Sequence, residues 1–178
     1  MDFKKHALIL AMIEELKANS SWTGKTHVQK AMFLVREATS VDNPFEFVLY
    51  KHGPYSFEIE NELEQMKSYG AISSTPQAGY GVVLQPGENA GFIKKNAALS
   101  DAEREAIRSI AKFVGSKNVV DLEKEATAVW IRNREGVVDT RKVAERMHGL
   151  KPHISTADAA VADRVVTTQL AGISKQAA

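Results

Sequence analysis

The chain has 178 residues, of which 44% are hydrophobic and 25% charged, as expected of one globular unit with a substantial core. It contains no cysteine, which excludes disulfides, thiolate zinc sites, iron–sulfur clusters and cysteine nucleophiles. The net charge is only +1, no apolar run approaches the roughly 18 residues of a membrane span, and no secretory signal is recognisable, so we expect a cytoplasmic protein without a membrane partner.

Two helices are predicted at the start of the chain. Residues 4–18 are apolar nearly all round, which is typical of a helix in the core. Residues 26–39 carry apolar side chains at helical spacing. Thr26 and Gln29 match a capping box, in which two polar side chains close the first turn, so we predict that this helix begins at Thr26.

A short strand and a third helix are predicted next. Over residues 45–50, Phe45, Phe47 and Leu49 alternate with Glu46, Val48 and Tyr50, which indicates a short strand. The strand is expected to end at Lys51–Pro54, and the helix to span about 55–69 with Pro54 shaping its first turn.

The remaining chain is predicted to contain a β-hairpin, a linker and four helices. The hairpin covers residues 71–84 and turns at 76–79, and residues 86–98 are expected to be the linker. Ser100 and Glu103 form a second capping-box pattern. The four helices are expected at about 100–114, 118–133, 139–148 and 155–171.

Together these elements predict an α+β, mostly α fold. Helix, helix, strand, helix and hairpin follow one another as in a winged-helix domain, which we assign to residues 1–92. Residues 99–173 form a C-terminal helical half, which we expect to pack with the first half into one compact unit.

The run Lys51–Ser56 is the most informative local stretch. Gly53 permits a close approach of the backbone, and the free N–H groups of a following helix turn can receive an anion or the acidic group of a partner. Lys51, His52 and Ser56 could add hydrogen-bond donors beside them. The alternative is a strand-to-helix corner that only positions the third helix.

The charge of the third helix argues against DNA reading. Four glutamates (Glu58, Glu60, Glu62 and Glu64) are expected on its outer face, where they would repel phosphate, and the hairpin carries no charged residue. A protein partner is therefore favoured. We predict a protein-binding surface made of Gln29, Lys30, Lys51, His52, Gly53, Pro54, Tyr55, Ser56, Glu58 and Glu62.

A nucleic-acid-binding regulator is the alternative function. Residues 1–92 hold 8 lysines and arginines against 11 acidic residues, whereas residues 93–178 hold 15 against 11. A basic surface is therefore expected in the second half, unless these residues form an ordinary solvated face. The candidate residues are Arg132, Arg134, Arg141, Lys142 and Arg146.

Catalysis is not expected. Arg141 and His148 lie two helical turns apart, a spacing that occurs in small helical RNases, and they are the candidate pair for such an activity. The five histidines lack the spacing of metal ligands, so neither a metal nor a cofactor is predicted.

Three stretches resemble the bacterial YwgA-like proteins and the related Panacea (SocA-like antitoxin) domain. Residues 26–34 resemble the "Leu-Gln-Lys-Leu-x-Tyr-Leu" helix of that group, and residues 47–56 resemble its strand followed by "Tyr-Gly-Pro-Tyr-Ser". Residues 150–155 are similar to its "Lys-Pro-x-Phe-Ser". The chain departs from the pattern at Val28, Ala31 and Phe33.

The resemblance implies an antitoxin-like or defence-associated protein that neutralises a toxin or another defence component by direct contact. Self-association is left open. The shared motif positions are Gln29, Lys30, Gly53, Pro54, Tyr55 and Ser56.

Overall fold

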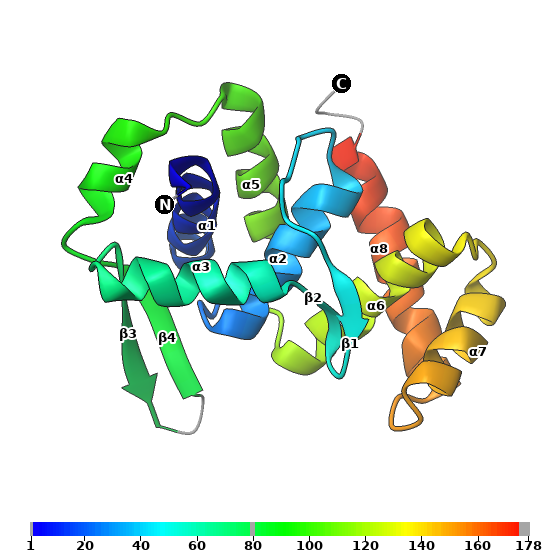
Figure 1. Ribbon diagram of the computed structural model, residues 1–178. Helices are drawn as coiled ribbons and strands as arrows, with labels where there is room; N and C mark the ends of the chain where they lie inside the picture. The colour runs from blue at the N-terminus through cyan, green and yellow to red at the C-terminus, as the bar shows by residue number, and fades with distance from the viewer. Residues whose placement is uncertain (1, 79–80, 175–178) are drawn as a thin grey trace.

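The computed structural model describes residues 2–78 and 81–174 (Figure 1). These residues are mostly helical and include two small antiparallel sheets, which confirms the α+β, mostly α class. The elements are α1 (Phe3–Ala18), α2 (Lys25–Ala38), β1 (Val48–Tyr50), β2 (Gly53–Tyr55), α3 (Phe57–Ser68), β3 (Ile72–Gln77), β4 (Gly81–Pro86), α4 (Ala90–Asn96), α5 (Asp101–Val114), α6 (Val119–Glu135), α7 (Thr140–Leu150) and α8 (Thr156–Ser174).

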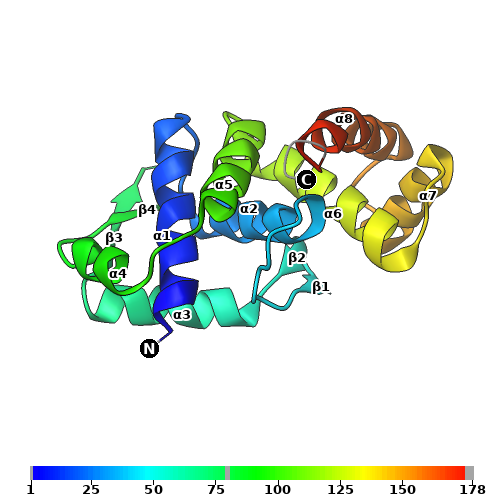
Figure 2. The same ribbon diagram turned by 90° about the horizontal axis from the view of Figure 1, so that it is seen from above.

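Helix α2 lies at the centre of the molecule, and every residue from His27 to Val35 is buried. It contacts α1 and α5 as well as α6 and α8, and Figure 2 shows α1 and α4 on one side of it and α6 to α8 on the other. Buried apolar side chains of both halves form one cluster. Residues 1–92 and 99–173 therefore share a hydrophobic core.

The strand predicted over residues 45–50 is shorter than expected and has a partner that sequence reasoning missed. Phe45 and Phe47 are buried, but only Val48–Tyr50 forms a strand, and it pairs with Gly53–Tyr55. Gly53 has φ +88°, a conformation that favours glycine and closes the tight turn at Lys51 and His52.

The third helix begins at Phe57, so the expected start at residue 55 was wrong. Pro54 does not shape the first helical turn, because it lies in β2 opposite Leu49. Ser56 is the N-terminal cap instead, and its Oγ accepts a hydrogen bond from the Ile59 N–H at 3.2 Å. A β-strand therefore occupies residues that were expected to begin the helix.

The β3–β4 hairpin is confirmed, with Ile72 opposite Pro86 and Gln77 opposite Gly81. The turn expected at 76–79 was placed too early, because Pro76 and Gln77 belong to β3; residues 79 and 80 lie outside the described residues. The winged-helix likeness of the first half stays a prediction.

The expected linker over residues 86–98 was wrong, because residues 90–96 form helix α4. Ala90 and Ile93 are buried, and the ring of Phe92 packs edge-on against Phe3 of α1 at 5.5 Å. This helix is too short to be stable alone, so its contacts with α1 stabilise it.

Candidate functional site

Gln29 joins the centre of the fold to the corner between β2 and α3. The predicted capping box was wrong, because α2 begins at Lys25 after Gly24, which makes no side-chain cap. Gln29 instead donates a hydrogen bond from Nε2 to the Ser56 carbonyl at 2.9 Å, and its Oε1 accepts one from the Ser56 N–H at 2.9 Å. Its side chain is buried, so Gln29 holds the corner in place and is not available to a partner.

Replacing Gln29 by leucine is expected to lower the free energy of unfolding by about 2 kcal/mol. Both hydrogen bonds to the Ser56 backbone would be lost inside the core, where water cannot replace them. Urea denaturation of both proteins would measure the change. Gln65→Leu, on the exposed side of α3, is the matched control. An equal midpoint for wild type and Gln29→Leu would contradict the anchoring role.

Lys30 is the most unusual ionisable residue of the corner. Its Nζ donates a hydrogen bond to the Pro54 carbonyl at 2.8 Å, and the residue is 2% exposed. Burial lowers the pKa of Lys30 to about 8; the carboxylate of Glu123 opposes this effect, and the charge of Lys151 adds to it. Gly53 lies directly over this side chain, because a Cβ there would stand 3.5 Å from the Lys30 Cε.

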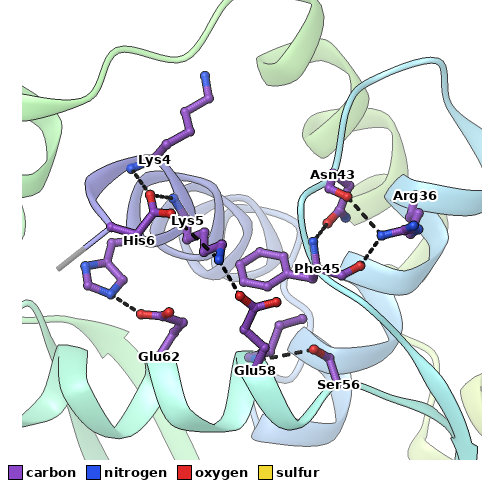
Figure 3. Close-up of polar contacts among 11 residues, drawn as sticks. Lys4, Lys5, His6, Arg36, Asn43, Phe45, Ser56, Glu58 and Glu62 are labelled. Atoms are coloured by element: carbon purple, nitrogen blue, oxygen red, sulfur yellow. Dashed lines mark hydrogen bonds and ion pairs between the residues drawn. The ribbon is translucent and has the colours of Figure 1, made fainter.

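The acidic outer face predicted for α3 was wrong, because Glu62 points inward. Its Oε2 lies 2.5 Å from Nε2 of the buried His6, as Figure 3 shows, and Tyr69 Oη lies 2.6 Å from the other ring nitrogen. Glu58 forms an ion pair with Lys5 of α1. Both residues predicted to contact a partner therefore bind α3 to α1 within the chain.

The remaining acids of α3 are also paired. Lys25 contacts both Glu60 and Glu64, and Lys67 lies 2.9 Å from Glu64. The hydrogen bonds from Lys25 and Lys67 lower the pKa of Glu64 to about 2. Because these charges are balanced locally, α3 offers much less free negative charge than the sequence indicated.

The Lys51–Ser56 run divides into a buried and an accessible part. Gly53, Pro54 and Ser56 are buried, so they support the corner and offer no side-chain surface. Lys51 and His52 are exposed on the β1–β2 turn. Tyr55 is partly buried, so only half of the predicted run is accessible to a partner.

Three aromatic side chains meet at the surface beside this turn. The rings of Tyr50, Tyr55 and Phe57, which we call the aromatic cluster, have centroids 5.1 to 5.8 Å apart. Phe57 is 57% exposed and Tyr50 50% exposed, and Val48 beside them on β1 is 46% exposed. Sequence reasoning missed Tyr50 and Phe57 as candidates, although Tyr50 lies in the predicted strand and directly before the Lys51–Ser56 run.

A hollow of about 250 Å³ lies between the aromatic cluster and the N-terminal turn of α2. Its lining includes Tyr50 and Tyr55, the basic residues Lys25, Lys30, Lys51 and His52, and one acidic residue, Glu60, which is paired with Lys25. Aromatic, cationic and imidazole groups therefore border one concave surface, an arrangement suited to binding.

The structure does not bring the predicted basic residues together as free cations. Arg132 forms a two-pronged ion pair with the buried Asp163, at 2.5 and 2.7 Å. Arg134 lies 2.7 Å from Glu37, and Arg146 lies 2.7 Å from Glu135. Lys142 and Arg141 are exposed, but Arg141 has a looser contact of 3.8 Å with Glu145.

Among the described residues, no contact brings the two enzymatic candidates, Arg141 and His148, into a common site. Nδ1 of His148 lies 2.7 Å from the Ile154 carbonyl, which it can bind as a donor, while Arg141 contacts Glu145. Within residues 2–78 and 81–174, no His, Asp and Glu side chains gather in a metal-binding group. No helix in that part of the chain combines the length and hydrophobicity needed to cross a membrane.

Comparison with known proteins adds no identification. No protein-family model and no curated protein matches this chain. The likeness to YwgA-like and Panacea proteins therefore stays a prediction that rests on the three sequence stretches.

Proposed function

We propose that this chain is a non-enzymatic, cytoplasmic, antitoxin-like or defence-associated protein that binds a protein partner through the aromatic cluster and the β1–β2 turn. The observation that carries this proposal is that Tyr50, Phe57 and Val48 are exposed together. Buried hydrogen bonds of Gln29 and Lys30 fix the adjoining backbone. Large exposed apolar patches mark interaction sites, and aromatic anchors supply most of the energy at protein interfaces.

The buried motif residues support this proposal indirectly. Gln29 binds the Ser56 backbone and Lys30 binds the Pro54 carbonyl, so both fix the segment that carries Tyr55 and Phe57. Such pre-positioning reduces the entropy lost on binding. The resemblance to an antitoxin domain suggests the class of partner, a toxin or a defence component. The hydrogen bonds of Gln29 and Lys30 support the choice of this surface as the binding site.

The double variant Tyr50→Ser, Phe57→Ser is expected to reduce recovery of the partner at least about tenfold, because interface aromatics are frequent hot spots. Tagged wild type and variant would be used in a pull-down from the native cells, with and without nuclease, and bound protein would be measured by mass spectrometry. The fold should persist, since both side chains are exposed in the free chain.

Val138→Ser, Val161→Ser is the control, because it removes two exposed apolar side chains, at least as accessible as Tyr50, from the α7–α8 side of the molecule. Equal recovery by wild type and the aromatic variant would remove this surface from the proposal. Partners that disappear after nuclease treatment would favour the nucleic-acid-binding regulator instead.

A further inference from the structure

A group of basic side chains surrounds one carboxylate where the β1–β2 turn meets the turn between α7 and α8. The carboxylate is Glu123 of α6, which is 7% exposed. Nζ of Lys151 lies 2.6 Å from its Oε1 and also donates to the Lys51 carbonyl at 2.5 Å. We call the following residues the basic cluster: Lys30, Lys51, His52, Lys151 and His153, of which Lys51 contacts Lys151 through its backbone carbonyl.

The two histidines approach the same carboxylate from the solvent side. Nδ1 of His52 lies 3.3 Å from the Glu123 Oε2, and Nε2 of His153 lies 3.7 Å from its Oε1. The side chains of His52 and His153 are 76% and 66% exposed, so a ligand can reach both of them. Glu123 therefore lies beneath an accessible rim of two imidazoles.

Positive charge exceeds negative charge at this place. Burial alone would raise the pKa of Glu123, but the hydrogen bond and charge of Lys151, with a smaller effect of His52, hold it below its usual value. Glu123 thus contributes one negative charge, against the buried ammonium groups of Lys151 and Lys30, and the exposed Lys51 adds a positive charge on the β1–β2 turn. The surface around it attracts anions.

The basic cluster and the aromatic cluster form one continuous surface. Lys51 and His52 directly follow Tyr50, and all three line the same hollow of about 250 Å³ together with Tyr55. A ligand that fills this hollow therefore meets aromatic rings and cationic groups, while the carboxylate of Glu60 in the same lining is paired with Lys25.

We propose, building on the proposed function above, that the protein partner presents an aspartate or glutamate side chain to the Lys51–His52 end of the hollow, with neighbouring apolar side chains on the aromatic cluster. A carboxylate fits because cationic donors form strong charge-assisted hydrogen bonds with it. The same complementarity selects against a basic partner surface, which would be repelled.

Selection of a display library of random short peptides on the full chain tests this inference. The enriched peptides are expected to combine aspartate or glutamate with aromatic or aliphatic residues. For the tightest of them, replacing the acidic residue by its amide, or Lys51→Glu in the protein, should weaken binding about tenfold, as is usual for loss of a charged interface contact. Lys95→Glu on α4 is the control for the change in net charge, because it too is exposed.

Enrichment of basic or uncharged peptides, absence of any enrichment, or binding that is unchanged by Lys51→Glu would overturn the inference. Displacement of the acidic peptides by free inorganic phosphate but not by acetate would reassign the basic cluster to a phosphate ligand. If the aromatic variant loses the natural partner while Lys51→Glu retains it, the proposed function survives and the acidic-partner inference fails.

Discussion

Arg132→Ala is expected to destabilise the protein by about 3 to 5 kcal/mol, because it leaves a buried carboxylate without its partner. Asp163 is 0% exposed, and both of its carboxylate oxygens accept hydrogen bonds from Arg132. The ion pair connects α6 to α8 in the C-terminal half. Urea denaturation followed by circular dichroism would measure the loss of unfolding free energy.

Two further variants separate this structural role from nucleic-acid binding. Arg141→Ala removes an exposed arginine and should change stability by less than about 0.5 kcal/mol. Arg132→Met with Asp163→Leu replaces both charges by apolar groups and should recover most of the loss. If Arg132→Ala kept full stability and instead lowered affinity for DNA or RNA, Arg132 would belong to a nucleic-acid surface.

The second large effect is a pH dependence that comes from Lys30. Its pKa is about 8 in the folded protein and 10.5 in a solvated chain. Between these values the unfolded chain holds a proton that the folded chain has released, so the stability of the wild type rises with pH. Relative to Lys30→Met, wild type should gain about 3 kcal/mol of unfolding free energy between about pH 7 and pH 10.5.

The quantity to measure is the difference in unfolding free energy between wild type and Lys30→Met, because all other ionisable groups titrate in both proteins. Unfolding free energies from urea titrations at the two pH values would give it. Parallel changes in wild type and Lys30→Met would show that Lys30 titrates normally. The Gln29→Leu variant keeps Lys30 and should retain the pH dependence, which makes it a control for general loosening of the corner.

Burying the ammonium group of Lys30 lowers the free energy of unfolding near neutral pH, and this loss of stability bears on function. A methionine could fill the same space without a charge, yet the chain places a lysine beneath Gly53 and beside Glu123. Strongly perturbed ionisable groups gather at functional sites more often than elsewhere. The position of Lys30 at the lining of the hollow agrees with that tendency.

Most helices could be predicted from the sequence alone. The capping box of Ser100 and Glu103 is present as predicted. These features are local, because a cap or a periodic pattern involves residues only a few positions apart. The sequence also indicated the importance of the Lys51–Ser56 corner, although it did not show which of its residues face solvent.

Which polar side chains are available to a partner depends on how the helices pack. Glu62 finds His6 in another helix, 56 positions away, and Gln29 finds the Ser56 backbone 27 positions away. Arg132 binds Asp163, 31 positions away. Because of these pairings, the predicted binding residues Glu62, Gln29 and Arg132 are engaged within the chain. No local pattern specifies such partners, because the packing of helices brings them within hydrogen-bond distance. The same packing leaves Tyr50 and Phe57 exposed, and so decides where a partner can bind.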